Sequence, residues 1–225
     1  MEILLATRNR NKLREFRDCF GRDFKVSDLS AFPAVALPEE TGHTFAENAA
    51  LKAVGVSQHR QLQDQHLLVL ADDSGLEVDA LGGAPGVFSA RYAGENATDR
   101  DNVDKLLSEL SQTRNRAARF RCALALARNS ELLKTVEGTV DGMIVDVPRG
   151  SCGFGYDPVF VPAGFDQTFA ELSSEVKNQI SHRADAARQL RRTLQAALDQ
   201  GFGGCGGGGG GGPGCPPPGP AAVRI

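Results

Sequence analysis

The sequence predicts an α/β fold in which helices flank a sheet and two lobes enclose a cleft. Three patterns lead to this prediction: a short apolar run followed by a polar turn and an amphipathic helix, a buried apolar run near the middle of the chain, and a later pair of strand-like segments. They lie at residues 3–20, 66–71 and 118–145. A strand–turn–helix unit favours a sheet with helices outside it, and the later pair adds a second lobe.

The composition limits the classes of protein to consider. The chain has 225 residues, of which 41% are hydrophobic, enough for one domain with a sizeable core or for two small lobes. Its 25 basic and 28 acidic residues give a net charge of −3, which provides no long-range attraction to nucleic acid or to an anionic membrane. No membrane-spanning run or secretory leader is recognisable, and the five cysteines lack the spacing of a zinc site. We therefore expect a cytoplasmic protein with neither nucleic acid nor a membrane as partner.

The first strand is expected at residues 3–6, and six polar residues follow at 7–12. Apolar residues then recur at spacings of three and four, which predicts a helix that begins within residues 9–11. A strand, a polar turn and a helix start direct free backbone N–H groups at an anion. The alternative is a solvated, well-capped helix start without a ligand. A second strand is expected at 24–27.

The next helix is predicted by a capping box, with Thr44 as N-cap and Glu47 reaching back to it. Asn48 and Lys52 lie four residues apart on this helix and therefore share one face. They could be an ordinary surface pair, or they could face a ligand, where the lysine would place a point charge on phosphate oxygens.

The central strand is expected at residues 66–71, where the run of branched apolar residues suits burial on both faces. The apolar run stops at Asp72, Asp73, Ser74 and Gly75, so we expect the strand to end there, with the carboxylates at its carboxyl end. Side chains of an extended segment alternate in direction, so the two carboxylates are predicted to occupy different sites, one of them as an orienting partner. A carboxylate at the end of a buried strand is also a suitable ligand for Mg²⁺. A turn without chemistry remains the alternative.

The following elements are expected to form the second lobe. A helix from Thr98 carries apolar residues at helical spacing and is assigned a packing role only. Residues 118–128 and 132–145 are expected to pair as an antiparallel hairpin with its turn at 128–131.

A glycine-rich loop at residues 150–158 follows, and its glycines permit a close approach of the backbone. Phe154 or Tyr156 offers a ring that could stack on a base, although the same pattern could be a structural turn with a core aromatic. The glycine spacing is not that of a dinucleotide-binding fingerprint.

Ser181 is the predicted N-cap of the last helix, whose apolar stripe comprises Ala187, Leu190, Leu194 and Leu198. His182 and Arg183 would begin that helix, in a position that is usually a plain surface. Glycine and proline dominate from residue 201 onward, so we expect a domain at 1–200 and a disordered tail at 201–225.

Five of these motifs, in this order, resemble those of the inosine/xanthosine triphosphate pyrophosphatase family of the Ham1 type. The most specific is the segment 71–94, which begins Ala-Asp-Asp-Ser-Gly and ends Ser-Ala-Arg-Tyr-Ala-Gly. The others are Thr7 with Lys12, the helix with Asn48 and Lys52, the Gly-Phe-Gly-Tyr-Asp-Pro run within 150–158, and Ser-His-Arg at 181–183. The resemblance covers about residues 3–199, and the tail departs from the family pattern.

The resemblance implies a long, mixed, curved sheet with helices outside and a nucleotide cleft between two lobes. It also implies an enzyme that hydrolyses ITP, dITP and XTP to the nucleoside monophosphate and pyrophosphate, which prevents their incorporation into DNA and RNA. Relatives act as homodimers and require Mg²⁺, with one or more ions per subunit and Mn²⁺ as a substitute.

The resemblance further implies the residues of the site. Asp73 is the implied catalytic base for the attacking water, and Glu40 and Asp73 are the implied metal ligands. The implied substrate contacts are Thr7, Arg8, Asn9, Arg10, Asn11, Lys12, Asn48, Lys52, Ser74, Phe154, Gly155, Tyr156, Asp157, Lys177, His182 and Arg183. Among these, Lys177, His182 and Arg183 are the implied contacts to the purine.

Two other functions stay open from the sequence. One is a Maf-type nucleotide pyrophosphatase, which the Gly-Phe-Gly-Tyr-Asp-Pro and Ser-His-Arg motifs disfavour. The other is a non-catalytic nucleotide-binding module, which the presence of Asp73, Glu40 and both lysines disfavours.

Overall fold

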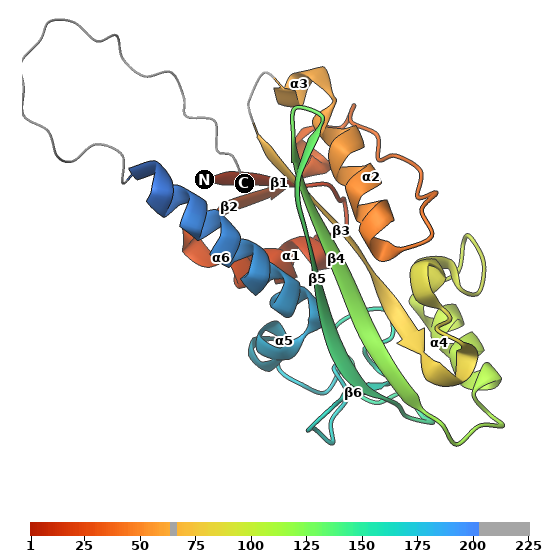
Figure 1. Cartoon of the computed structure of the whole chain (residues 1–225). Coiled ribbons are helices and arrows are strands. Elements are labelled where there is room, and N and C mark those ends of the chain that lie inside the picture. The colour runs from red at the N-terminus through yellow and green to blue at the C-terminus, as the bar shows by residue number, and fades with distance from the viewer. Residues whose placement is uncertain (64–66, 203–225) are drawn as a thin grey trace, which may run out of the picture.

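The computed structural model describes residues 1–63 and 67–202, and within them a twisted, curved six-stranded sheet organises the chain (Figure 1). Its strands are β1 (Glu2–Leu5), β2 (Lys25–Asp28), β3 (Leu68–Val78), β4 (Ala117–Arg128), β5 (Glu131–Ile144) and β6 (Phe160–Pro162). Their order is β2-β1-β3-β4-β5-β6, with parallel pairing of β1 to β2 and β3 and antiparallel pairing from β3 to β6. The predicted α/β class with a mixed sheet is confirmed.

Helices cover both faces of this sheet. The α-helices are α1 (Arg10–Phe20), α2 (Phe45–Ser57), α3 (Arg60–Gln63), α4 (Asp99–Glu109), α5 (Ser174–Ile180) and α6 (His182–Phe202), and short 3₁₀ turns are η1 (Gly21–Asp23), η2 (Leu29–Ala31), η3 (Asp79–Leu81) and η4 (Gly86–Arg91). α1 and α6 pack together on one face, and α2 packs on the other (Figure 1). None of the helices in the described part of the chain combines the length and hydropathy that a bilayer crossing requires.

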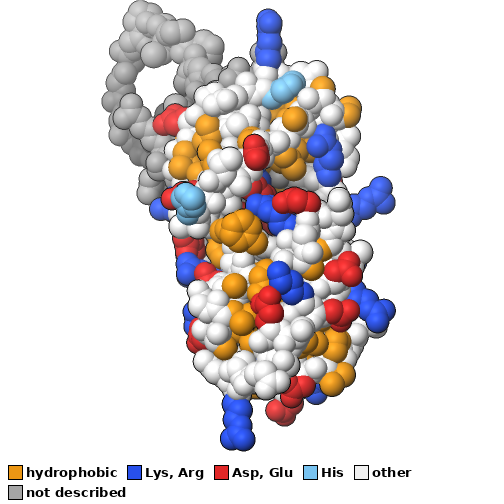
Figure 2. All heavy atoms as spheres, turned by 90° about the vertical axis from the view of Figure 1, so that its right-hand side faces the viewer, with side chains coloured by type: hydrophobic (Ala, Val, Ile, Leu, Met, Phe, Trp, Pro, Cys, Tyr) orange, Lys and Arg blue, Asp and Glu red, His pale blue; other side chains and the backbone are white. Residues whose placement is uncertain are grey.

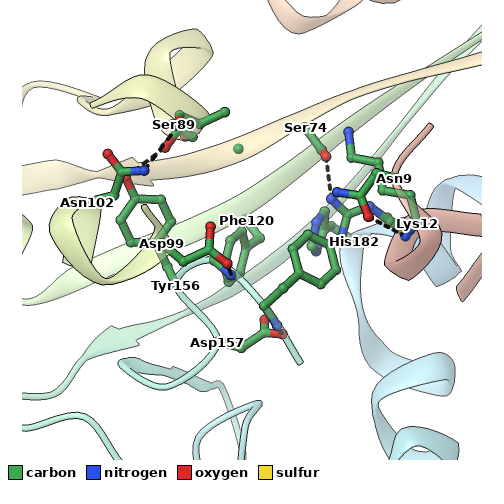
Figure 3. A pocket seen from close by; sticks show the side chains of 15 residues that line it. Asn9, Lys12, Ser74, Ser89, Asp99, Asn102, Phe120, Tyr156, Asp157 and His182 are labelled. Atoms are coloured by element: carbon green, nitrogen blue, oxygen red, sulfur yellow. Dashed lines mark hydrogen bonds between the residues drawn. The ribbon is translucent and has the colours of Figure 1, made fainter. Parts of the chain in front are cut away.

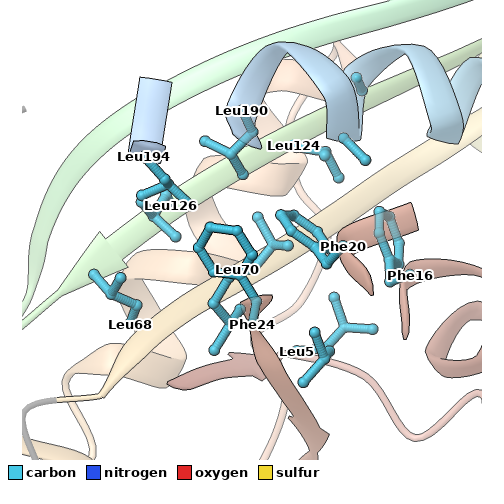
Figure 4. Close-up of a cluster of buried hydrophobic side chains, with 14 of the residues drawn as sticks. Leu5, Phe16, Phe20, Phe24, Leu68, Leu70, Leu124, Leu126, Leu190 and Leu194 are labelled. Atoms are coloured by element: carbon cyan, nitrogen blue, oxygen red, sulfur yellow. The ribbon is translucent and has the colours of Figure 1, made fainter. Parts of the chain in front are cut away.

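The first lobe has its core between α1, α6 and the sheet. Phe16 and Phe20 of α1 meet Leu70 of β3, Leu124 of β4 and Leu190 of α6 in one buried cluster (Figure 4). Each such side chain contributes about 1.5–3 kcal/mol by leaving water. The apolar spacing of α1 and α6 thus fixes the position of the two helix N-termini that approach the site.

The second lobe forms where β3, β4 and β5 extend beyond the short strands β1 and β2. Leu76, Phe120, Phe160 and Phe169 are buried there together with the apolar face of α4. The predicted hairpin is confirmed, and its turn residues Asn129 and Ser130 both have positive φ. Two consecutive positive φ values match the twist of a hairpin turn.

The prediction that the central strand ends at Asp72 was wrong. β3 continues to Val78, because Asp72 and Asp73 pair with Leu124 and Ala123 of β4. The ladder to β4 satisfies the backbone and outweighs the turn preference of Asp, Ser and Gly. Both carboxylates are therefore presented by a rigid strand and not by a turn.

Other local predictions agree with the structure to different degrees. The capping box at Thr44 and the helix from Thr98 are confirmed, and Ser181 caps α6 by accepting the Ala184 N–H at 3.2 Å. α3, α5 and β6 were not predicted, since each is short. α6 continues to Phe202, two residues beyond the predicted boundary. The tail was predicted to be disordered, and its residues from 203 onward lie outside the described part of the chain. The side chain of Leu198 also lies outside it.

Candidate functional site

The alternation of β3 divides the site into two halves. Asp72 and Asp73 point to opposite sides of the strand, as expected for neighbours in an extended segment. The Asp73 carboxylate lies 2.9 Å from Lys52 Nζ, whereas the Asp72 carboxylate lies 2.6 Å from Lys12 Nζ. Two different lysines, from α2 and α1, are thus bound to adjacent residues of one strand.

On the first side, Lys52 joins the two predicted metal ligands. Its ammonium lies 2.9 Å from Asp73 Oδ1, 3.0 Å from Glu40 Oε1 and 2.8 Å from the Asp72 carbonyl. The second oxygen of Asp73, Oδ2, is buried without a hydrogen-bond partner. Burial raises the pKa of Asp73 in spite of the nearby Lys52, and the Glu40 and Asp72 carboxylates raise it further. An unpartnered carboxylate oxygen with raised basicity is suited to hold a water or a cation.

α2 fixes this side because its capping box closes its first turn. Thr44 accepts the Glu47 N–H at 3.2 Å, and Asn48 Oδ1 accepts the Gly42 N–H at 2.8 Å. The second bond ties the loop that carries Glu40 to the helix that carries Lys52. Asn48 Nδ2 is buried and has no partner, so one donor is left for a ligand.

On the other side, a buried series of alternating charges leads away from Lys12. Glu15 Oε2 accepts from Arg183 Nη1 at 3.0 Å, and Glu15 Oε1 lies 2.8 Å from Lys177 Nζ. Lys177 also pairs with Asp157. Burial alone would raise the pKa of Glu15, but Arg183 and Lys177 outweigh it and lower that pKa below its ordinary value. Glu15 is therefore held as a charge between these two cations.

A pocket of about 160 Å³ lies between the side of the site that holds Lys12 and Arg183 and the second lobe (Figure 3). Asn9, Lys12, Ser74 and His182 lie at one end of it, and Ser89 and Asn102 lie at the other (Figure 3). It is lined by Asn9, Lys12, Ser74, Gly75, Ser89, Ala90, Asp99, Asn102, Phe120, Phe154, Gly155, Tyr156, Asp157, His182 and Arg183. Ligand sites commonly measure about 300–1,000 Å³, so this volume suits one part of a larger ligand, such as a base.

Aromatic rings give the pocket its walls. His182 stacks on Phe120 with ring centroids 4.8 Å apart and planes 9° apart. The Phe154 ring lies 5.0 Å from the Arg183 guanidinium carbon and 5.2 Å from Lys177 Nζ, at cation–π distance. Burial lowers the pKa of His182 well below its ordinary value, and the neighbouring Arg183 lowers it further, so the ring is neutral.

Comparison with known proteins gives one consistent result. A profile of the Ham1 family matches residues 3–193. The chain is 49% identical over 198 residues to a dITP/XTP pyrophosphatase of Bacillus subtilis, covering 87% of this chain and 98% of that protein. This chain belongs to the Ham1 family. Among solved structures, a Ham1 protein of Staphylococcus aureus matches with a TM-score of 0.76 and 43% identity over 87% of this chain and 99% of that one, and a HAM1 protein of Coxiella burnetii matches with a TM-score of 0.77 and 41% identity over 87% and 99%.

In this Ham1-family chain, most of the expected substrate contacts come together at the pocket. Asn9 caps α1 by accepting the Asn11 and Lys12 N–H groups, at 2.9 and 3.2 Å. Thr7 supports it by accepting the Asn9 N–H at 3.1 Å. Gly155, Tyr156 and Asp157 reach the pocket from the second lobe.

Seven predicted contacts do not line the pocket: Thr7, Arg8, Arg10, Asn11, Asn48, Lys52 and Lys177. The Arg8 guanidinium donates to the carbonyls of Pro33 and Val35, at 3.2 and 3.0 Å, and so turns from the pocket. Arg10 lies on a separate surface depression with Arg14 and Arg17. Lys177 supports the pocket through its ion pairs but does not line it.

Sequence reasoning missed several residues of this Ham1 site. Ser89, Asp99, Asn102 and Phe120 line the pocket, and Glu15 joins its two buried cations. Glu15 follows Lys12 by three residues and therefore shares its helix face, which is a signal that the sequence contained. The other four carried no local signal, because only tertiary packing brings them together.

The site fits the magnesium that the Ham1 resemblance implies. Glu40 and Asp73 supply two carboxylates, and the unpartnered Asp73 Oδ2 is an available oxygen. Within residues 1–63 and 67–202, no group of three or more His, Cys, Asp or Glu side chains is arranged to hold a metal. Magnesium is usually held by one or two carboxylates, with waters and substrate phosphates as its other ligands. The two carboxylates of Glu40 and Asp73 meet that requirement.

Proposed function

We propose that this chain hydrolyses non-canonical purine nucleoside triphosphates, namely ITP, dITP and XTP, to the nucleoside monophosphate and pyrophosphate, and so prevents their incorporation into DNA and RNA. The observation that carries the proposal is the state of Asp73, whose Oδ1 pairs with Lys52 while its buried Oδ2 has no hydrogen-bond partner, next to the pocket residue Ser74 on the same strand. The names of the relatives, dITP/XTP pyrophosphatase, support the same substrate class.

The residues divide the work between charge and positioning. Lys12, Lys52 and the N-terminus of α1 neutralise and hold phosphate oxygens, which is the main requirement of catalysis on phosphoanhydrides. Asp73 orients the attacking water and accepts its proton at Oδ2, which its raised pKa favours. Mg²⁺ held by Glu40 and Asp73 would supply charge neutralisation at the phosphates. The Asn48 Nδ2 donor is available to a phosphate oxygen or to a bound water.

The base is proposed to lie in the pocket between Phe154 and the His182–Phe120 stack. Arg183 is permanently charged and donates only, and the neutral His182 donates from one ring nitrogen. Donors match the carbonyl at position 6 of hypoxanthine and xanthine, whereas the amino group of adenine would leave a donor unpaired.

We further propose a cytoplasmic homodimer with magnesium, or manganese as its substitute. Cys19, Cys122 and Cys152 are free thiols, as a reducing compartment favours. The homodimer is proposed from the family resemblance. On the face over α2 and α4, acidic, basic and apolar side chains are mixed, which supports a small-molecule substrate over nucleic acid (Figure 2). Sedimentation equilibrium would measure the assembly.

The experiment that tests the activity is pyrophosphate release with Mg²⁺ from ITP, dITP, XTP, GTP, ATP and dUTP, measured side by side. We expect the first three to be preferred. Preference for dUTP or a methylated nucleotide would favour a Maf-type activity, and tight binding of ITP without turnover would favour a binding module.

A further inference from the structure

Asp72 has no role in the proposed chemistry, yet it is the most connected carboxylate of the site. Its side chain is 1% exposed. Oδ2 lies 2.6 Å from Lys12 Nζ and accepts from Ser74 Oγ at 3.2 Å, and Oδ1 accepts from Cys122 Sγ at 3.1 Å. A buried carboxylate is retained at a cost in desolvation, so such a set of partners calls for an explanation.

The fourth partner of Asp72 comes from a second helix, α6. Arg183 Nε lies 3.5 Å from Asp72 Oδ2, and Arg183 Nη2 donates to Ser74 Oγ at 2.6 Å. Asp72 and Ser74 are two residues apart on β3 and therefore share a face of the strand. Together they contact the guanidinium of Arg183, a residue of α6.

Asp72 thus lies between two cations from different helices, of which Arg183 also contacts α1 through Glu15. Lys12 belongs to α1, at the proposed phosphate end, and Arg183 belongs to α6, at the proposed base end. Oδ2 of Asp72 lies 2.6 Å from Lys12 Nζ and 3.5 Å from Arg183 Nε, so one carboxylate oxygen faces both cations. When phosphate oxygens attract Lys12, its ion pair with Asp72 weakens, and Asp72 then interacts mainly with Arg183.

We infer that Asp72 is a positioning residue that couples the two ends of the substrate, because its one carboxylate holds the phosphate-side Lys12 and the base-side Arg183 together. The inference rests on the proposed function. It goes beyond that function in predicting that the contributions of Lys12 and Arg183 to substrate binding depend on each other through Asp72.

The test is a set of double-mutant cycles. Lys12→Met, Arg183→Met and the double variant are made with Asp72 intact and again with Asp72→Asn, and the Kd of ITP is measured for all eight proteins. Binding stays measurable where turnover is lost. With Asp72 intact, we expect the change in Kd of the double variant to differ by at least about fivefold from the product of the two single changes. With Asp72→Asn, we expect the double change to agree with that product within about twofold.

If Asp72 has a purely structural role, Asp72→Asn should weaken ITP binding by the same factor in every variant and leave the non-additivity unchanged. That result would overturn the inference. Additive effects with Asp72 intact would also overturn it. If the unaltered protein releases pyrophosphate from ITP while either result is found, the proposed function stands and only the coupling fails. Absence of both ITP turnover and ITP binding in the unaltered protein would instead reject the proposed function and the inference with it.

A milder pair of variants decides the matter if Asp72→Asn does not fold, as judged by near-ultraviolet circular dichroism. Cys122→Ala removes one donor to Asp72, and Cys122→Ser replaces it with a hydroxyl donor. We expect the Lys12–Arg183 non-additivity to fall about twofold or more in Cys122→Ala and to recover in Cys122→Ser. Equal non-additivity in both would count against the coupling.

Discussion

Asp72 and Asp73 are adjacent residues whose environments give them opposite chemistry. Asp72 faces Lys12 and Arg183, which hold its pKa low and keep it a fixed charge. Asp73 is also buried, but it shares its single lysine with Glu40, so burial prevails and raises its pKa. A fixed charge suits positioning, whereas a more basic carboxylate with a free oxygen suits proton transfer.

Replacement of Asp73 by asparagine is expected to abolish turnover and preserve the fold. The change removes the basic oxygen at nearly constant volume, and general-base contributions are about 10²–10⁴-fold. Pyrophosphate release from ITP and circular dichroism measure the two effects. Asp79→Asn is the control, because Asp79 pairs with Arg119 away from the pocket. Turnover of Asp73→Asn within a few-fold of the unaltered enzyme would exclude Asp73 as base or metal ligand.

Activity is expected to require Mg²⁺ or Mn²⁺ and to survive a zinc-selective chelator in excess Mg²⁺. The reason is the donor set of Glu40 and Asp73, in which both donor atoms are hard oxygens. The metal requirement is measured as turnover after exhaustive dialysis and again after each metal is added back. Loss of activity to the zinc chelator under those conditions would contradict the assignment of a magnesium site.

His182 makes stability depend on pH near neutrality. Burial opposes protonation of its ring most, Arg183, Lys177 and Lys12 oppose it further, and Asp72 favours it. Its folded pKa is therefore depressed, while in the unfolded chain it is about 6.5. Above pH 6.5 both states hold a neutral ring, and below it the unfolded state binds the extra proton.

The free energy of unfolding is consequently expected to fall between pH 7.5 and 5.5, with His182 contributing at most ~1.4 kcal/mol. Urea unfolding at both pH values measures it, and His182→Gln serves as the matched variant without a titrating ring. The unaltered protein should lose more stability over this range than the variant. An equal loss in the two proteins would mean that His182 is protonated in the folded state.

At the scale of elements, the contact between α6 and β5 sets the position of the base pocket. A Cβ at Gly138 of β5 would lie 2.2 Å from the His182 carbonyl oxygen and 2.5 Å from the Ala186 nitrogen. Only glycine allows the helix backbone to approach so closely. The first turn of α6, with His182 and Arg183, is thus seated directly on the sheet.

Gly138→Ala is therefore expected to displace α6 and weaken ITP binding by about tenfold or more, with a destabilisation of about 1–3 kcal/mol from overpacking. Steady-state kinetics and thermal unfolding measure both. Thr139→Ala is the control, since the neighbouring Thr139 is exposed on the opposite face of β5. Unchanged KM in Gly138→Ala would show that the pocket tolerates movement of α6.

How much the sequence could predict also follows from the elements. The capped helices and the β4–β5 hairpin were predictable because their signals are local: the Thr44 box, and the alternation around residues 128–131. The continuation of β3 through Asp72 was not, since it depends on pairing with β4, which is distant in sequence. Residues of four predicted motifs line the pocket, whereas the motif with Asn48 and Lys52 does not. Phe120 and Asn102 were missed because their strand and helix patterns look like ordinary packing.

The whole molecule consists of two lobes that share one sheet and meet at the pocket. α1 and α6 bring the cations Lys12 and Arg183 from the first lobe, and the second lobe brings Phe154 and Tyr156. The long strands β3 and β4 pass through both lobes, so the two halves of the site are held by continuous backbone. We therefore expect the activity to depend on the relative position of the two lobes and not on the residues that follow α6.

Truncation after Phe202 is accordingly expected to leave Tm within about 2 °C and ITP turnover unchanged. The segment from 201 to 220 holds 12 of the 26 glycines and five of the 11 prolines, a composition with little apolar surface to bury. The contrasting variant ends after Gln189 and loses Leu190 and Leu194, both buried against α1 and the sheet. Those two side chains represent at least ~3 kcal/mol, which corresponds to a fall in Tm of about 6 °C or more. Differential scanning calorimetry on both variants separates the cases. A similar fall for the truncation after Phe202 would show that residues 203–225 dock on the folded domain, and a loss of turnover at constant Tm would show that they take part in the site.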